Sequence, residues 1–189
     1  FATAGQISWS GSVDGSYTPP WVFDTYDVPR VTEINGTVFP LYWNAIYLQK
    51  LTDFVNAVAA RYDTDPSVAA VQIGIGQGGE TEPDGSADHN THQLQLWQRY
   101  GYTNALWWDT VKRIVAIYEA AFTHTPLAIM TTSTFLKYDD KYYNRALVEQ
   151  YAVQQGLWLQ INSLDDSMPT SILANGVNDL TTTVEEQRQ

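Results

Sequence analysis

Residues 68–75, with the sequence VAAVQIGI, are apolar or small at nearly every position. A strand of this composition has both faces buried, which is typical of a parallel sheet that is covered by helices. Two further short apolar runs have the same character and are predicted strands: PLAIMTT at 126–132 and LWLQIN at 157–162. The chain therefore has to build a buried sheet from strands that are well separated in sequence.

Amphipathic helices are predicted between these strands. Asn44 can cap the first helix, and Pro66 in the run DTDP stops it, because proline disfavours helical geometry in the residue before it. Its apolar residues recur at three and four positions, at Leu48, Leu51, Phe54, Val55, Val58 and Tyr62. The second helix, 106–122, has its apolar face at Trp107, Val111, Ile114, Val115, Tyr118 and Phe122. Residues 142–153 form a third helix.

The order helix, strand, helix, strand, helix, strand predicts an α/β fold with parallel strands and right-handed crossovers. An eight-stranded (β/α) barrel usually needs about 250 residues, so 189 residues predict an incomplete barrel, and a small open α/β sheet is the alternative. We expect one domain over 1–189. It consists of a long loop and hairpin region at 1–44, alternating helix and strand units at 45–163, and a loop and tail at 164–189.

The region before the first predicted helix has two parts. The first thirty residues contain Gly, Ser, Pro and aromatic residues without a period and are predicted to form a long loop. The run VTEINGTVF at 31–39 alternates around Asn35-Gly36, which is a favoured hairpin turn, and the hairpin ends at Pro40. The sequence begins with Phe1, so we expect a processed chain or a piece of a longer one.

Charge and composition exclude several classes of function. The formal net charge is −11, and the 10 Lys and Arg residues do not cluster, so nucleic acid is not an expected partner. The absence of cysteine excludes disulfides, zinc-thiolate sites and thiol nucleophiles. No apolar stretch approaches the roughly 20 residues that span a bilayer, so no membrane partner is expected either. No cofactor is expected, and the oligomeric state stays open.

The glycines after the first predicted strand allow two interpretations. Gly74, Gly76 and Gly79 have the G-x-G-x-x-G spacing of a dinucleotide-binding loop. That motif requires a helix at the third glycine, and here Glu80 and a run rich in Pro and Gly follow it. We therefore favour the other interpretation: the strand ends near Gln77, and small residues make room for Glu80 at its carboxyl end, where active sites form in α/β folds.

Three segments resemble a known enzyme family: PPWV at 19–22, the long run from Pro40 to Pro83, and LWWDTVKRIVAIYEAAF at 106–122. They are similar to the central part of a clan A retaining glycoside hydrolase of the beta-galactosidase type. This resemblance implies a (β/α)8 barrel of which the chain holds about strands three to six. It also implies a carbohydrate substrate and Glu80 as the general acid/base. Many clan members have Asn directly before the acid/base, whereas this chain has Gly79.

Retaining hydrolysis needs two carboxyl groups about 5 to 5.5 Å apart. The resemblance places the nucleophile beyond the end of the given sequence, and Asp165 and Asp166 are the nearest alternatives within it. Glu82 is the alternative candidate for the general acid/base. The non-catalytic interpretation of Glu80 is an ordinary solvated carboxylate or a partner of Arg61.

Further candidates for sugar contacts are aromatic or polar. Trp21 and Trp43 can stack on sugar rings or pack on neighbouring loops, and Gln77, Glu82 and Asp165 are candidate substrate-binding residues. Trp107, Trp108 and Trp158 lie in helix or strand patterns and are expected in the core. His89 and His92, with Asp84 or Asp88, could hold a metal, but a polar surface loop at the rim of a cleft is the favoured interpretation, and no metal site is assigned.

The sequence thus predicts an acidic, secreted hydrolase, extracellular or in the cell envelope. The alternative is a non-catalytic extracellular protein that binds carbohydrate or has a structural role.

Overall fold

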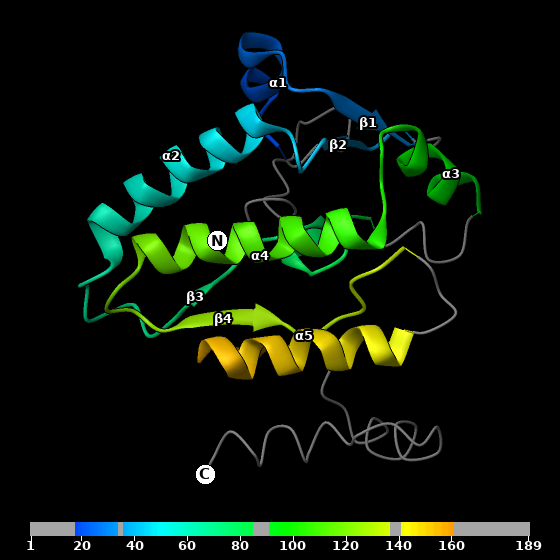
Figure 1. Ribbon diagram of the computed structural model, residues 1–189. Coiled ribbons are helices and arrows are strands. Elements are labelled where there is room, and N and C mark those ends of the chain that lie inside the picture. The colour runs from blue at the N-terminus through cyan, green and yellow to red at the C-terminus, as the bar shows by residue number, and fades with distance from the viewer. Residues whose placement is uncertain (1–17, 34–35, 85–90, 137–140, 161–189) are drawn as a thin grey trace.

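The computed structural model describes residues 18–33, 36–84, 91–136 and 141–160 (Figure 1). Its elements, in chain order, are α1 (Pro20–Tyr26), β1 (Arg30–Thr32), β2 (Val38–Pro40), α2 (Ala45–Tyr62), β3 (Val71–Gln72), a 3₁₀ turn (Gln77–Gly79), α3 (Thr91–Arg99), α4 (Asn104–Ala121), β4 (Leu127–Met130), α5 (Lys141–Gln155) and β5 (Trp158–Gln160).

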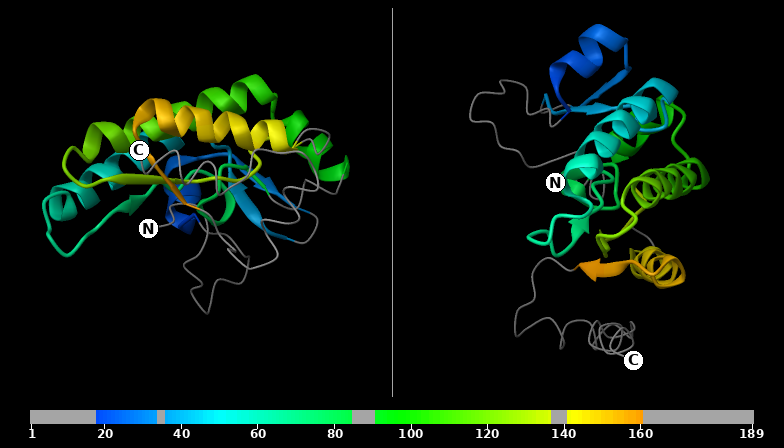
Figure 2. Two further views of the ribbon diagram at one scale, coloured as in Figure 1. Left: turned by 90° about the horizontal axis from the view of Figure 1, so that it is seen from below. Right: turned by 90° about the vertical axis from the view of Figure 1, so that its left-hand side faces the viewer.

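Three of the strands form a parallel sheet in the order β3-β4-β5. Val71 pairs with Leu127, and Ala128 pairs with Trp158. The helices α2, α4 and α5 lie on one side of this sheet (Figure 2). All four residues of β4 are buried, which confirms the prediction of a covered strand there. The prediction is wrong for the other two strands: β3 has only two residues, of which Val71 alone is buried, and no residue of β5 is fully buried.

The prediction of a (β/α) barrel is wrong. The described residues contain one sheet of three parallel strands and one of two antiparallel strands, and neither closes on itself. Alternating helices and parallel strands are common to barrels and to open sheets, so the sequence pattern does not distinguish them. A barrel differs from an open sheet in its number of strands and in the pairing of its first and last strands, and the alternation of elements specifies neither.

The helices α2 and α4 begin and end close to their predicted bounds. The Asn44 side chain accepts hydrogen bonds from the amides of Ile46, at 2.9 Å, and Tyr47, at 3.1 Å, so it caps α2 as predicted. Thr103 caps α4 in the same way, through the Leu106 amide at 3.1 Å. The six apolar residues predicted to form the inner face of α4 and its end are all buried.

Two details of the predicted core are wrong. Phe54 of α2 is 46% exposed, because the buried face of this helix is rotated toward Tyr47, Leu48, Leu51, Val55 and Ala59. Trp158 of β5 is 53% exposed, so it is not a core residue. The other two tryptophans predicted in the core pack as expected: Trp107 is fully buried, and Trp108 packs edge-on against Tyr151. The spacing of apolar residues therefore predicts the position of a helix more reliably than it predicts which of its side chains are buried.

The N-terminal region is more ordered than predicted. The described part of the first thirty residues includes α1, so the prediction of a continuous loop is wrong there, and Trp21 lies in this helix. The hairpin is confirmed: β1 and β2 pair antiparallel with Val31 opposite Phe39, and β2 ends at Pro40. The turn residue Asn35 lies outside the described residues. The helix α3 was also not predicted, because its sequence is mostly polar.

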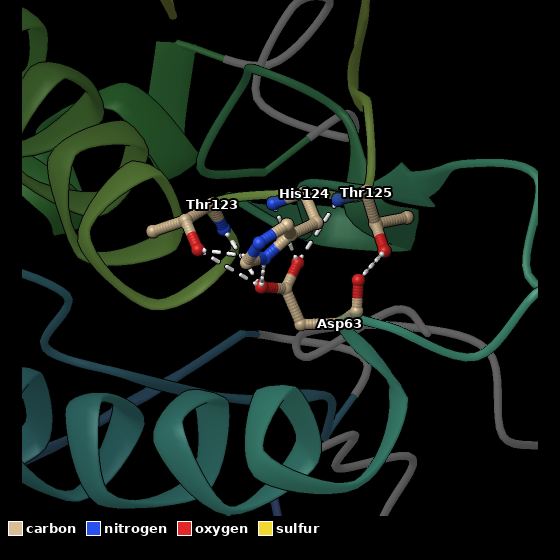
Figure 3. Close-up of polar contacts among 4 residues, drawn as sticks. All are labelled: Asp63, Thr123, His124 and Thr125. Carbon is tan, nitrogen blue, oxygen red and sulfur yellow. Dashed lines mark hydrogen bonds and ion pairs between the residues drawn. The ribbon is translucent and has the colours of Figure 1, made fainter.

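Asp63, at the C-terminus of α2, joins the two loops that lead into β3 and β4 (Figure 3). Its carboxylate accepts hydrogen bonds from the consecutive amides of Thr123, His124 and Thr125 at 2.9 to 3.0 Å. The His124 ring and the Thr123 hydroxyl contact the same carboxylate. Burial opposes ionisation of Asp63, but these hydrogen bonds outweigh it and hold its pKa well below its usual value.

No helix among the described residues is long and apolar enough to cross a membrane.

Candidate functional site

The glycine-rich segment after β3 folds back on itself. The Gly76 amide donates to the Glu80 carbonyl at 2.8 Å, and the Gln77 amide donates to the Glu82 carbonyl at 3.1 Å. Gly78 and Gly79 have φ of 66° and 83°, which favours glycine at both positions. Because the chain's own carbonyls occupy these amides and Glu80 is extended rather than helical, the segment lacks the geometry of a phosphate-binding loop.

Gly76 is required by close packing within this turn. A Cβ atom at this position would lie 1.8 Å from the carbonyl oxygen of Glu82. The backbone of Gly76 has a φ of −116°, so the contact, and not a left-handed conformation, excludes a side chain. The turn therefore brings the backbone of Glu82 directly against Gly76, at the start of the 3₁₀ turn.

Thr81 fixes the turn to the sheet and to α4. Its amide and hydroxyl both lie within hydrogen-bond distance of Thr132, which follows β4, at 3.0 to 3.2 Å. Its carbonyl accepts from the indole of Trp107 at 3.0 Å and from the hydroxyl of Thr134 at 2.8 Å. Thr81 and Trp107 are fully buried, so these bonds are shielded from water.

Aromatic residues support the segment that follows. The hydroxyl of Tyr42 donates to the Pro83 carbonyl at 3.1 Å, and the indole of Trp97 donates to the buried carboxylate of Asp84 at 2.8 Å. The two rings stack with centroids 5.8 Å apart and an angle of 16° between their planes. Trp97 comes from α3, the helix that was not predicted, so this helix contributes directly to the position of residues 80–84.

Glu80 and Glu82 are brought together by this turn. Glu80 is partly exposed, whereas Glu82 is only 8% exposed. Thr81, which lies between them, contacts Thr132 through its hydroxyl. Burial raises the pKa of Glu80 and the contact with Glu82 lowers it, with burial the larger effect. The pair can therefore hold a proton at a higher pH than an ordinary glutamate can.

The other predicted sugar contacts are dispersed. Trp43 packs on the core against Trp97 and Tyr102, with ring centroids 6.0 and 6.3 Å apart. Trp21 is 53% exposed on α1. Gln77 lies in the 3₁₀ turn next to Glu80. Asp165 and Asp166 lie outside the described residues.

Asp84 is committed to the protein interior. It is fully buried and accepts a hydrogen bond from Trp97, so it does not belong to a polar surface loop. Within 18–33, 36–84, 91–136 and 141–160, no group of three His, Cys, Asp or Glu residues has the arrangement of a metal site. His89 and Asp88 lie outside these ranges. Arg61 is placed over the ring of Tyr62, at 5.4 Å, and not against Glu80.

Thr81, Thr132, Tyr42 and Trp97 hold the site in place, and none of them was a predicted site residue. The sequence indicates only one feature of this arrangement, the spacing of Glu80 and Glu82. In an extended backbone, side chains two residues apart point to the same side.

No family model, no curated protein and no solved structure matches this chain. The resemblance of residues 40–83 to clan A glycoside hydrolases stays a prediction.

Proposed function

We propose that the protein is a glycoside hydrolase-like enzyme that cleaves O-glycosidic bonds with retention, and that Glu80 is its general acid/base. The setting of Glu80 carries this proposal: it lies at the end of the 3₁₀ turn that comes after β3, it is partly exposed, and burial raises its pKa. A general acid needs a carboxyl group that stays protonated near the working pH. The rigid turn that holds Glu80 supplies the fixed orientation that proton transfer requires.

The chemistry proceeds in two steps. The protonated Glu80 gives its proton to the glycosidic oxygen while the bond from this oxygen to the anomeric carbon breaks, and a nucleophilic carboxylate binds the same carbon. In the second step the Glu80 carboxylate takes a proton from water, and the water oxygen displaces the nucleophile. Each cycle returns both carboxyl groups to their starting state.

Glu82 does not fit the role of the nucleophile. Its side chain interacts directly with Glu80 and lowers the pKa of that carboxyl group, whereas the two carboxyl groups of retaining enzymes are separated by about 5 to 5.5 Å. It is also buried, which leaves little room for a sugar ring beside it. We assign the nucleophile to a carboxylate from outside the described residues.

The test compares two aryl β-galactosides that differ in their leaving group. Dinitrophenolate leaves without protonation, and phenol requires it. We expect the Glu80→Gln variant to lose about a hundredfold or more in rate on the phenyl substrate, while the first step on the dinitrophenyl substrate is nearly unchanged. If the Glu80→Gln variant and the wild-type protein have the same rate on the phenyl substrate, and also on the dinitrophenyl substrate, Glu80 has no role in the mechanism.

A second candidate function is carbohydrate binding without catalysis. Trp21 and Tyr26 on α1 are 53% and 38% exposed and lie edge to face, with ring centroids 6.0 Å apart. Lys50 of α2 lies over the ring of Tyr26, at 4.5 Å. Exposed aromatic faces next to polar groups are suited to the apolar faces of sugar rings.

This candidate is tested by binding of a β-linked galacto-oligosaccharide, measured by calorimetry. Trp158 is as exposed as Trp21, at 53%, but lies on β5, so Trp158→Ala is the matched control. We expect Trp21→Ala to weaken binding about tenfold, in line with the loss of one aromatic contact, and the control to leave it unchanged. Equal effects of both variants would contradict a site on α1.

A further inference from the structure

We propose that a second copy of this chain binds to the outer face of α1 and α2 through a two-fold axis, so that the protein forms a homodimer. Four exposed side chains define this surface, which we call the α1–α2 face: Trp21 and Tyr26 on α1, and Ile46 and Phe54 on α2. The inference goes beyond the proposed function and does not depend on it.

Exposed large apolar side chains are concentrated on the α1–α2 face. Its four members are between 38% and 53% exposed. Among the described residues, the other exposed side chains of this kind are separate from one another: Tyr100 follows α3, Val153 lies on α5 and Trp158 lies on β5. Isolated exposed apolar residues are normal, whereas a group of them marks an interaction surface.

The four side chains form one continuous surface around Lys50 of α2. Trp21 and Tyr26 lie edge to face with ring centroids 6.0 Å apart, and the Nζ atom of Lys50 lies 4.5 Å from the centroid of the Tyr26 ring. Ile46 and Phe54 are four residues before and after Lys50, so these three side chains form one ridge along the helix. The ridge is about 12 Å long, and α1 lies at the N-terminal end of α2 (Figure 1).

The packing of the fold itself does not require these apolar residues. The buried side of α2 is formed by other side chains, namely Tyr47, Leu48, Leu51, Val55 and Ala59. Phe54 lies outside this set and is 46% exposed, although the exposed side of such a helix is usually polar. A contact with another molecule explains an aromatic ring at this position.

Charge makes a second copy the partner that suits the α1–α2 face. The chain has a formal net charge of −11, so two copies repel each other in most orientations. The helices α1 and α2 together carry two acidic residues, Asp24 and Asp53, and two basic residues, Lys50 and Arg61, so their net charge is zero. Lys50 is also paired with Asp53 at 2.6 Å. Two copies can therefore meet here without net repulsion, whereas a strongly charged partner finds no excess charge to bind.

A two-fold axis close to Lys50 defines the contacts of the dimer. An axis perpendicular to α2 makes the two copies of this helix antiparallel, so that Phe54 of one copy lies against Ile46 of the other. Because α1 lies at the N-terminal end of α2, Phe54 also approaches Tyr26 of the other copy. Ridges formed by every fourth residue pack against each other in this way in ordinary helix pairs. Each contact occurs twice, so one substitution removes two contacts.

The test is sedimentation equilibrium of the full chain over a range of concentrations, without any carbohydrate. We expect a monomer–dimer equilibrium in the micromolar range, because the apolar centre is smaller than in an obligate dimer. Phe54→Glu should weaken association about tenfold or more, since it buries a charge in an apolar contact. Val153→Glu makes a similar change at a side chain that is 55% exposed on α5, and this matched control should leave association unchanged.

The inference is overturned if the wild-type chain stays monomeric at every concentration that sedimentation can reach. It is also overturned if a dimer forms but Phe54→Glu weakens it no more than Val153→Glu does. Circular dichroism and urea unfolding verify that both variants are as stable as the wild-type chain. Because no substrate is present, failure of this inference and failure of the proposed function are separate results.

A mixture of two variants tests the antiparallel register and supplies a second variant at another position. Ile46→Lys and Phe54→Glu should each associate weakly alone. In a mixed dimer, the two introduced charges are opposite and lie against each other on one side of the axis, while the other side keeps the native contact between Ile46 and Phe54. We expect the mixture to contain more dimer than either variant alone. A mixture that associates no better than its components contradicts the proposed dimer.

Discussion

The indole nitrogen of Trp107 on α4 donates a 3.0 Å hydrogen bond to the carbonyl oxygen of Thr81, the residue between Glu80 and Glu82. Trp107 is fully buried and also contacts the Thr134 hydroxyl at 3.2 Å. A core side chain thus sets the backbone of the candidate site. The stability of the fold and the geometry of the two glutamates are coupled through this bond.

Replacement of Trp107 by Phe should destabilise the protein by about 1–3 kcal/mol, because a buried carbonyl loses one of its two donors. Chemical denaturation measures the free energy of unfolding. The control is Trp21→Phe, at an exposed position, which should change this free energy by less than about 0.5 kcal/mol. Equal effects of the two replacements would show that the bond between Trp107 and Thr81 is unimportant for stability.

Alanine at Gly76 should be more damaging than alanine at Gly101. At Gly76 the new Cβ would lie 1.8 Å from the Glu82 carbonyl oxygen, and overpacking of this kind costs about 3 kcal/mol. Gly101 has a φ of 89° but no atom within 4 Å, so only backbone strain of about 1–2 kcal/mol is expected there. Thermal unfolding of the two variants gives the order, and the reverse order would contradict the close packing of the turn.

Asp63 should make the stability of the fold depend on pH. Its pKa is depressed in the folded protein by its hydrogen bonds, so its contribution is fully present above the unfolded pKa of about 3.9. The contribution is lost as the pH falls from there toward the folded pKa. Asp63→Asn should therefore cost about 1.5–3 kcal/mol at pH 7 and clearly less at pH 3.

Urea unfolding at the two pH values tests this prediction for Asp63. Asp109→Asn, a change at an exposed position of α4, is the control and should show no such dependence. A penalty for Asp63→Asn that is the same at pH 7 and pH 3 would mean that the ionised carboxylate is not what holds the loops before β3 and β4.

The sequence predicted the elements that depend on local signals. Asn44 as a cap and the turn before Pro66 define α2, and the apolar spacing of α4 identified its buried face. The fully buried strand β4 was recognised from composition alone. In each case a short segment contains the physical reason for its own structure, so no knowledge of distant residues is needed.

Features that depend on distant residues were not predictable in this way. The helix α3 has few apolar residues, and Trp97 is buried because Tyr42 stacks on it and Asp84 accepts its hydrogen bond. The strand was predicted to end near Gln77, but β3 ends at Gln72 and a 3₁₀ turn precedes Glu80, so Glu80 does not lie at the strand end. The barrel was inferred from the family resemblance and from an alternation that open sheets share, and this prediction failed.

Chemical rescue of the Glu80→Ala variant tests the central claim most directly. With sodium azide and the dinitrophenyl β-galactoside, a retaining enzyme that lacks its acid/base should regain turnover and release a galactosyl azide with the anomeric configuration of the substrate. We predict this product for Glu80→Ala. An inverted azide, or no azide product from a variant that stays folded while the wild-type protein is active, would contradict the role of Glu80 as the acid/base.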